Sequence, residues 1–192
     1  MAILGGGPAA TGPLIWAAQS GRLGEVLDHG VAIVEREAEM GGSLARYIIN
    51  ADSMGTSFLE CLDPPPACAI FHRVRAAAAT RRMELQRGNY PPLRLIAEFE
   101  QCLHRALAEL VRAHPACAFL PRTTVASIHF NTAGGAAVRF AEGGGIAART
   151  IVFGMGGRQD VAATLDADIR PGLRLRDLPR KKLVPSGRLL TD

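Results

Sequence analysis

The sequence contains no run of about 18 apolar residues, the length that a membrane-spanning helix would require. We therefore expect no membrane association. The apolar first residues also lack the positively charged start of a secretory signal peptide, and Gly-Gly-Gly-Pro would interrupt the apolar region of such a peptide. Because both features are missing, we expect a cytoplasmic location.

Cysteine pairs of the kind that bind zinc are missing as well. The four cysteines of the chain are Cys61, Cys68, Cys102 and Cys117. None of them forms a Cys-x-x-Cys pair, and the nearby His104 and His114 do not have the spacing of zinc ligands. We therefore predict no metal site, and free thiols that are buried or half-buried in a reducing compartment.

Lysines and aromatic residues are scarce. Lys181 and Lys182 are the two lysines among 22 basic residues, and aromatic residues make up 5% of the chain. The most basic stretch, residues 169–188, has no aromatic side chains on which bases could stack. The net charge is +4 and the isoelectric point is about 9.2. We interpret this stretch as a solvated segment and expect no nucleic-acid partner.

A length of 192 residues fits one domain with a sizeable core. The first 35 residues predict a strand, a helix and a second strand. Residues 2–4 form a short apolar run, residues 9–19 have a helical pattern, and residues 31–34 form a continuous apolar run typical of a buried parallel strand. Residues 23–28 are expected to add a further helical turn.

The glycines between the first strand and the first helix match a dinucleotide-binding fingerprint. Gly5, Gly7 and Ala10 follow the pattern G-x-G-x-x-G/A. Gly5 permits a tight turn, Gly7 lets the backbone approach a diphosphate, and Ala10 is small enough for the helix to lie close to the strands. The first helical turn, which starts at Pro8 and Ala9, then directs its positive end at the diphosphate. Taken alone, these residues are explained equally well by an ordinary glycine-rich turn.

The second strand ends in an acidic residue that fits the same interpretation. Glu35 follows Val34 directly, where a carboxylate can accept hydrogen bonds from the ribose hydroxyls of an adenosine. Its charge would repel a 2′-phosphate, so we expect an unphosphorylated adenosine. A solvated acid at a strand end is the alternative. The separation from Gly5 exceeds the usual spacing of roughly 20 residues, which an insertion at residues 21–30 would explain. Pro13 would also remove a hydrogen bond from the helix.

The rest of the chain predicts helices followed by an antiparallel meander. Helices are expected at residues 56–62, 67–86 and 93–112, and the last has apolar residues at three- and four-residue spacing. Strands are expected at residues 125–130, 137–140 and 146–153, separated by the turns NTAGG and AEGGG. The predicted fold class is α/β, with a Rossmann-type parallel sheet and a three-stranded antiparallel meander.

The order of these features resembles the FAD-binding half of two-dinucleotide flavoproteins. That group includes the glutathione-reductase-like disulfide reductases and the flavin-dependent monooxygenases. The resemblance covers residues 1–159 and implies FAD as the cofactor, with NAD(P)H as electron donor. It also implies cofactor contacts from Gly42 of the Gly41-Gly42 pair, from Val125 near the adenine, and from Gly154 and Gly156. The last two stand where those proteins have an Ala-Thr-Gly sequence.

Within that group, GGGPAATGPL and NADSMGTSFLECL are most similar to bacterial FAD/NAD(P)-binding proteins near the N-hydroxylating monooxygenases. This resemblance implies that a reduced flavin passes one oxygen atom to a substrate. The Cys-x-x-x-x-Cys pair of the disulfide reductases is absent, so disulfide chemistry is not expected. Asn50, Asp52 and Ser53 could contact the flavin or a substrate, but an ordinary polar loop explains them better. The catalytic residues and the substrate are not predicted.

We expect an FAD-binding domain at residues 1–160 and a linker at residues 161–192 toward a missing NAD(P)-binding unit. No second glycine-rich fingerprint follows Gly157, and the first strand is short, so we interpret the chain as a truncated or split product. The sequence is compatible with an oligomer and with a missing C-terminal half. One alternative is an NAD-binding dehydrogenase domain, although no Tyr-x-x-x-Lys pair is present. Another is a non-catalytic, truncated remnant that binds a nucleotide weakly.

Overall fold

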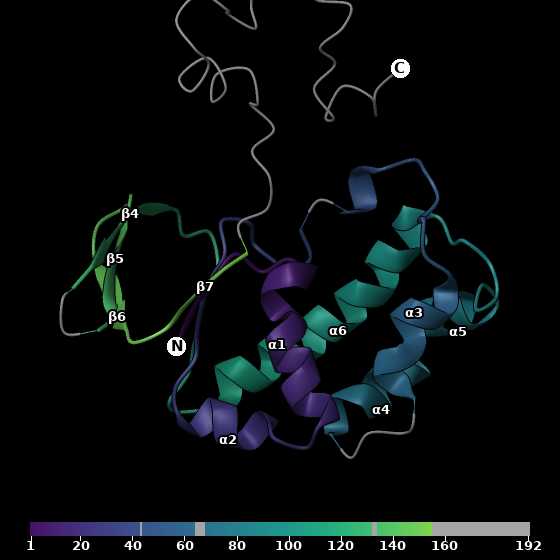
Figure 1. Cartoon of the computed structure of the whole chain (residues 1–192), viewed down its shortest axis with the longest axis horizontal. Helices are drawn as coiled ribbons and strands as arrows, with labels where there is room; N and C mark the ends of the chain where they lie inside the picture. Colours follow the sequence, from purple (N-terminus) through teal and green to yellow (C-terminus); the bar gives the residue numbers. More distant parts are fainter. Residues whose placement is uncertain (43, 64–67, 132–133, 155–192) are drawn as a thin grey trace, which may run out of the picture. The chain divides into compact units, whose positions relative to one another are not determined.

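The computed structural model describes residues 1–42, 44–63, 68–131 and 134–154 (Figure 1). These residues belong to one compact unit. The predicted domain boundary at residue 160, the predicted linker at residues 161–192 and the predicted cofactor contact at Gly156 lie outside the described residues.

The described residues form two sheets and several helices. The strands are β1 (Ala2–Leu4), β2 (Ala32–Val34), β3 (Ala118–Leu120), β4 (Val125–Phe130), β5 (Ala136–Phe140), β6 (Gly145–Ala148) and β7 (Ile151–Phe153). The α-helices are α1 (Pro8–Gln19), α2 (Leu23–Asp28), α3 (Gly55–Leu59), α4 (Ala69–Ala76), α5 (Ala78–Glu84) and α6 (Leu93–Ala113). Two short 3-10 helices are η1 (Leu44–Arg46) and η2 (Glu60–Leu62).

The first sheet is parallel, with strand order β3-β2-β1-β7. In the register of this sheet, Ile3 of β1 lies between Ile33 of β2 and Val152 of β7. All of β1 is buried, as expected for a central parallel strand. The predicted β-α-β unit is therefore present in the first 35 residues.

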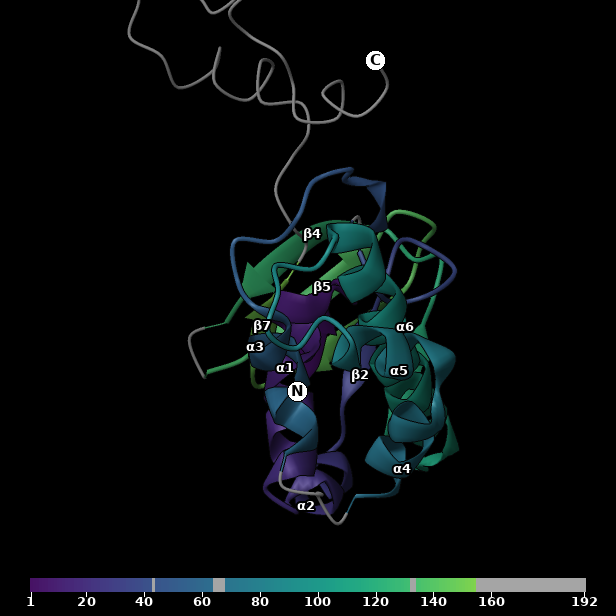
Figure 2. The same ribbon diagram turned by 90° about the vertical axis from the view of Figure 1, so that its right-hand side faces the viewer.

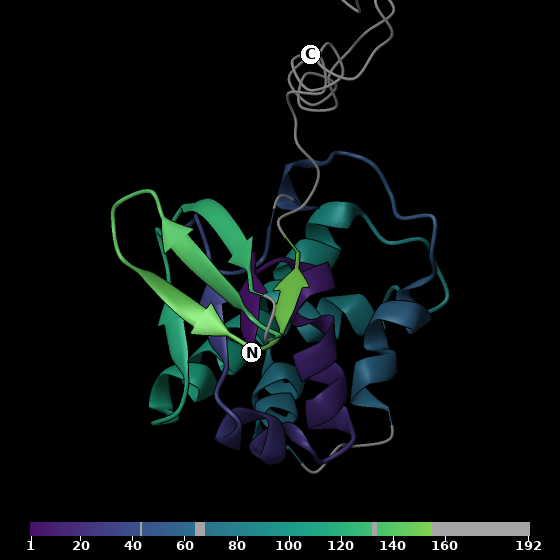
Figure 3. The same ribbon diagram turned by 60° about the vertical axis from the view of Figure 1, so that its left-hand side comes forward.

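Side chains of the parallel sheet alternate between two apolar clusters. Ile3 and Ile33 pack with residues of α1 and α6, whereas Leu4 and Val34 pack with Val138 of β5. Because successive side chains in a strand point to opposite faces, the helices cover one face of the sheet and the β4-β5-β6 meander covers the other. Figure 3 shows the two sheets and the helices from the side of the meander. The predicted α/β fold class is confirmed.

The predicted meander is present, but its last strand is shorter than expected. Strands β4, β5 and β6 pair antiparallel in this order. The predicted strand at residues 146–153 is in fact two strands, because the chain leaves the meander after Ala148. It then joins the parallel sheet as β7, where Ile151 pairs with Ala2. The run is apolar on both sides of Arg149 and Thr150, so its pattern did not reveal the change of sheet.

Strand β3 was not predicted, because three residues carry too little pattern to be recognised. The predicted helix at residues 67–86 was also wrong in one respect. It is two helices, α4 and α5, separated at Ala77, whose ψ of 144° is extended. The Thr80 hydroxyl donates to the carbonyl of Val74 across this break at 2.5 Å. Such side-chain bonds compete with helical ones, and the alanine-rich sequence contains no breaker there.

Helix α6 agrees with its prediction and packs against α4 and α5 (Figure 2). Ile96, Phe99, Leu103 and Leu107 of its apolar face are buried. Helix α1 continues through Pro13 without interruption, and α2 accounts for the unusually long connection to β2. In the described part of the chain, no helix combines the length and apolar character needed to cross a membrane.

Candidate functional site

The predicted fingerprint forms the turn between β1 and α1. Gly5 has a φ of +98°, a conformation that favours glycine, and its amide donates to the carbonyl of Val34 at 2.8 Å. Gly7 is the N-cap residue of α1, and Pro8 occupies the start of the helix. The first turn of α1 has no side-chain cap and no acidic residue. Its positive end is thus suited to an anion such as a diphosphate.

The surroundings of Gly7 leave room for a ligand. A Cβ placed on Gly7 would meet nothing closer than the Cα of Gly42, at 4.0 Å. A Cβ on Gly6 would instead lie 2.7 Å from the Cγ of Met40, so the protein itself excludes a side chain there. The glycine at position 7 is therefore not required by packing. It fits the close approach of a bound group.

The Glu35 carboxylate reaches this turn from the end of β2. Its Oε2 accepts a hydrogen bond from the Gly6 amide at 2.5 Å, and its Oε1 accepts one from the Glu37 amide at 2.8 Å. The residue is 8% exposed. A carboxylate has about four acceptor positions, so two amides leave capacity for hydroxyl donors. Glu35 thus lies beside the glycine turn rather than on the other side of the sheet.

The Gly41-Gly42 pair lies against the same turn. The Gly41 amide donates to the carbonyl of Gly6 at 2.9 Å. Both glycines have positive φ, +135° and +67°. A Cβ on Gly42 would be 3.6 Å from the Cα of Gly7 and 3.7 Å from the ring of Pro8. The structure therefore brings Gly42 to the fingerprint, and its contact with a cofactor stays a prediction.

Strand β7 returns the chain to α1 at Gly154. The Gly154 amide donates to the carbonyl of Leu4 at 2.8 Å. A Cβ on Gly154 would overlap the Cβ of Ala10 and lie 2.7 Å from its Cα. Ala10 is completely buried, whereas Ala9 beside it is exposed. Small residues at positions 10 and 154 thus allow the helix to begin directly against the end of β7.

Val125 also lies near the carboxyl end of the parallel strand β2. It is the first residue of β4 and packs, partly buried, against the cluster that contains Val34. The segment before it passes the end of β2, because the Thr123 amide donates to the carbonyl of Glu35 at 2.9 Å. The described residues predicted to bind a cofactor thus lie around the carboxyl ends of the parallel strands, where α/β sheets usually bind ligands. The contacts to a cofactor remain predictions.

A buried polar pair behind the fingerprint was missed from the sequence. The Thr11 hydroxyl donates to the carbonyl of Gly7 at 3.1 Å and lies 2.9 Å from the Nε2 of His104 on α6. Both residues are buried, and burial lowers the pKa of His104 to about 4. The imidazole is therefore neutral at pH 7, with Nε2 donating to Thr11, since the hydroxyl uses its own hydrogen on Gly7.

His104 therefore connects α6 to the first turn of α1. Its Nδ1 is buried and has no hydrogen-bond partner among the described residues. A Cβ on Gly41 would lie 3.7 Å from this nitrogen. The sequence signal was a histidine directly beside the apolar face of α6, because a buried polar side chain usually has a specific partner.

A pocket of about 350 Å³ adjoins the glycine pair on the α6 side. Its lining residues are Gly41, Gly42, Ala45, Arg82, Ala97, Glu98, Gln101, Cys102 and Arg105. Glu39 fixes two of these lining side chains, because it accepts hydrogen bonds from Gln101 at 2.8 Å and from Arg105 at 3.1 Å. The pocket touches Gly42 but includes neither Gly5 nor Gly7, so it extends the candidate site rather than forming the diphosphate position.

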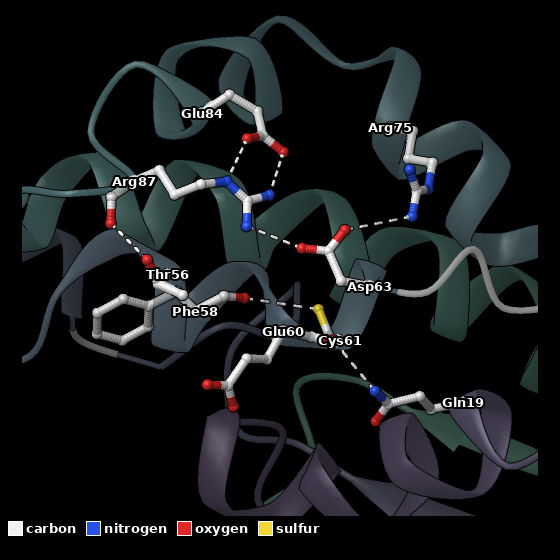
Figure 4. A network of polar contacts seen from close by, with 9 residues as sticks. All are labelled: Gln19, Thr56, Phe58, Glu60, Cys61, Asp63, Arg75, Glu84 and Arg87. Atoms are coloured by element: carbon white, nitrogen blue, oxygen red, sulfur yellow. Dashed lines mark hydrogen bonds and ion pairs between the residues drawn. The ribbon is translucent and has the colours of Figure 1, made fainter.

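The segment NADSMGTSFLECL is fixed by close contacts, of which Figure 4 shows the hydrogen bond between Thr56 and Arg87. A Cβ on Gly55 would overlap the carbonyl group of Gln86. The Gly55 and Thr56 amides donate to the carbonyls of Asn89 and Arg87, both at 2.9 Å, and the Thr56 hydroxyl donates to the Arg87 carbonyl at 2.7 Å. This part of the motif therefore has a structural role in joining α3 to the end of α5.

The Arg87 side chain completes this network (Figure 4). Its guanidinium donates to both carboxylate oxygens of Glu84, at 2.8 and 3.0 Å, and to Asp63 at 2.8 Å. These acidic partners raise the pKa of Arg87.

The three polar residues that were predicted as loop or ligand contacts are Asn50, Asp52 and Ser53. Asn50 pairs with Pro92 as an isolated bridge, and Ser53 donates to Asp52 at 3.3 Å.

Sequence comparison finds one informative relative. The chain is 31% identical over 198 aligned positions to CMP-5′-(3-aminopropyl)phosphonate hydroxylase from Streptomyces rubellomurinus (strain ATCC 31215). The alignment includes 99% of this chain and 44% of the hydroxylase, so the chain spans less than half of that enzyme's length. No protein-family profile matches the chain.

Three solved structures illustrate the structural similarity. Glycine oxidase from Bacillus cereus ATCC 14579 has 14% identity and a TM-score of 0.46, with 81% of this chain and 54% of that chain covered. Cyclohexanone monooxygenase has 16% identity and a TM-score of 0.44, with 81% and 26% covered. A thioredoxin reductase from Gloeobacter violaceus has 18% identity and a TM-score of 0.36, with 82% and 34% covered.

All three TM-scores are below 0.5, so these structures support no assignment of function. The chain is similar to FAD/NAD(P)-binding flavoproteins, of which it spans only a part.

Proposed function

We propose that the turn around Gly7 binds the diphosphate of FAD and that Glu35 binds the ribose of its adenosine. The observation that carries this proposal is the Glu35 carboxylate, which is bonded to the Gly6 amide directly beside the uncapped start of α1. A helix start attracts the negatively charged diphosphate, and the remaining acceptor capacity of the carboxylate suits two neighbouring hydroxyls.

The chain would then supply the FAD-binding part of a flavoprotein oxidoreductase. The bound flavin supplies the redox chemistry, with electrons from NAD(P)H. The residues of this chain bind and orient the cofactor: the α1 start and Gly42 hold the diphosphate, Glu35 holds the ribose, and Val125 lies near the adenine. The Thr11–His104 pair keeps the Gly7 carbonyl in place behind them.

The most specific reaction that we propose is a monooxygenation. The relative with 31% identity is named as a hydroxylase, and the motif NADSMGTSFLECL resembles the N-hydroxylating monooxygenases. A hydroxylase that uses a flavin inserts one oxygen atom into its substrate.

Titration of the purified chain with FAD tests the proposal. We expect binding near one FAD per chain, measured by calorimetry and by the flavin absorption bands. Glu35→Gln should weaken FAD binding by about ten- to a hundredfold, because hydrogen bonds to a charged group are worth about 1.5–3 kcal/mol. Glu37→Gln is the matched control, since the Glu37 side chain is exposed and pairs with Arg36 on the surface. Equal affinities in the two variants would contradict the role of Glu35.

The same titration with NAD and NADP separates the alternatives. Binding of NAD with no uptake of FAD would favour the NAD-binding dehydrogenase domain. Weak binding of all three dinucleotides would favour a non-catalytic remnant. Under both of these alternatives, the affinity for NADP should be lower than that for NAD, because the Glu35 carboxylate would repel a 2′-phosphate.

A further inference from the structure

A second cluster of reactive side chains lies at the opposite end of the parallel strands. Asp28 ends α2, His114 caps the C-terminus of α6, and Cys117 directly precedes β3. These residues stand at the amino ends of β2 and β3, whereas the candidate nucleotide site stands at the carboxyl ends. Gly30, with a φ of +82°, lets the loop before β2 approach the carbonyl of Ala116.

The hydrogen bonds of His114 define which ring nitrogen carries its hydrogen. Nε2 lies 3.2 Å from the Asp28 Oδ1, an atom that can only accept when the carboxylate is ionised. Nδ1 lies 3.3 Å from the Ala116 amide, which can only donate. In the neutral ring, Nε2 therefore carries the hydrogen, and Nδ1 presents a lone pair.

The Cys117 thiol faces that lone pair. Its Sγ is 3.7 Å from Nδ1 of His114, and the thiol donates to a second acceptor, the carbonyl of Leu27, at 3.3 Å. Of the two, only the imidazole is a base. The Val31 amide donates to Sγ at 3.4 Å, a contact that stabilises negative charge on sulfur.

Two features favour a positive charge on His114 when it takes the thiol proton. Its partner Asp28 is a carboxylate, and His114 occupies the C-cap position of the 21-residue helix α6. The C-terminal end of a helix carries a partial negative charge, which attracts a positively charged histidine. When Nδ1 of His114 takes the thiol proton, it can no longer accept the hydrogen bond from the Ala116 amide. That hydrogen bond is long, at 3.3 Å, so little is lost.

Among the described residues, the thiols of Cys61 and Cys102 have no comparable arrangement. All four cysteines are free and half-buried. Burial raises the pKa of Cys61 to about 11 and also raises that of Cys102. Their thiols contact backbone carbonyls instead of a base, those of Phe58 and Glu98. They serve as internal references within the same chain.

We propose that Cys117, His114 and Asp28 form a reactive-thiol site that exchanges with low-molecular-weight disulfides. His114 Nδ1 accepts the proton of Sγ, and the resulting thiolate attacks one sulfur of the disulfide. The new bond from Sγ forms as the old S–S bond breaks. The departing thiolate takes the proton from His114, so that one disulfide and Cys117 give a mixed disulfide and one free thiol. The disulfide is the oxidant, and Cys117 is oxidised.

The test measures the rate of modification at each cysteine of the whole folded chain. The probes are oxidised glutathione and 5,5′-dithiobis(2-nitrobenzoate), followed by peptide mass spectrometry. We expect Cys117 to react at least about tenfold faster than Cys61 and Cys102, because general-base activation contributes this much or more. Equal rates at the three positions would overturn the proposal.

His114→Gln removes the base and should slow the reaction of Cys117 at least about tenfold. Asp28→Asn keeps the base but removes its charged partner, and should slow Cys117 less. His29→Gln is the matched control, because the hydrogen bond of the His29 ring in the described part of the chain is to the carbonyl of Glu25 in the preceding helix α2. A variant that fails to fold would expose Cys61 and Cys102 as well, so faster labelling there identifies it. Unchanged labelling of Cys117 in both His114→Gln and Asp28→Asn overturns the proposal.

Discussion

Replacing Gly154 with alanine should damage both the fold and the candidate FAD site. The new Cβ would overlap the Cβ of Ala10 and lie 2.7 Å from its Cα, whereas carbon atoms in contact are normally about 3.5–4.0 Å apart. The start of α1 or the end of β7 must therefore move by about 1 Å. Overpacking of this kind costs about 1–3 kcal/mol. We expect a loss of about 3 kcal/mol, because the overlap involves the Cα and the backbone nitrogen of Ala10 as well as its Cβ.

Urea denaturation should show this loss as a lower free energy of unfolding, and a thermal scan should show a decrease in Tm of about 10 °C. FAD affinity should decrease at least about tenfold, because the displaced turn carries the amides that we propose to bind the diphosphate. Ala10→Gly in the same chain removes one of the overlapping atoms, so the double variant should recover part of the stability.

Two other glycine substitutions serve as matched controls. A Cβ on Gly12, inside α1, meets nothing within 4 Å, so Gly12→Ala should stabilise the helix by about 0.5–1 kcal/mol. Gly7→Ala should change stability by less than about 1 kcal/mol but weaken FAD binding strongly. If Gly154→Ala unfolds at the same urea concentration as the unsubstituted chain, the close contact between β7 and α1 does not exist, and the reasoning fails.

Further predictions concern the network and the buried ionisable groups. Gly55→Ala should destabilise the chain by about 1–3 kcal/mol in urea denaturation, because its Cβ would overlap the Gln86 carbonyl group; unchanged stability would contradict this. Burial raises the pKa of Glu100 to about 7, so its contribution to stability is present below pH 4.5 and is lost as the pH rises through 7, by at most about 3 kcal/mol. Burial lowers the pKa of His104 to about 4, so its contribution is present above pH 6.5 and is lost as the pH falls through 4. Between pH 4.5 and 6.5 the two groups change the free energy of unfolding in opposite directions. In Glu100→Gln only the effect of His104 remains, so the free energy of unfolding should fall steadily as the pH is lowered. A pH dependence identical to that of the unsubstituted chain would contradict the raised pKa of Glu100. His104→Leu should weaken FAD binding more than His104→Asn, since asparagine can still donate to Thr11.

The part of the site that could be predicted from the sequence is the part built from neighbouring residues. Gly5, Gly7 and Ala10 form one turn, whose conformation depends on glycine and on helix geometry rather than on distant contacts. Glu35 was predictable for a related reason. It follows a buried strand directly, and adjacent parallel strands end at the same edge of a sheet.

The features that were missed depend on contacts between distant segments. The apolar run at residues 146–153 has one composition, but its two halves join different sheets, because Ile151 pairs with Ala2 near the start of the chain. The break at Ala77 arises where α4 and α5 both pack on α6, and no local residue marks it. His104 stands 93 positions from Thr11, so its partner could not be inferred from spacing.

The glycines of the candidate site are of two kinds, and the distinction bears on function. At Gly6 and Gly154 a side chain would collide with Met40 or Ala10, so packing alone explains these glycines. At Gly7 the backbone angles suit any residue, with φ of −78° and ψ of 174°, and a Cβ at this position would have its nearest neighbour 4.0 Å away. Neither strain nor crowding within the protein requires glycine there. The proposed binding of a group at the start of α1 would account for a glycine there, which is the physical reason to propose the diphosphate site at this turn.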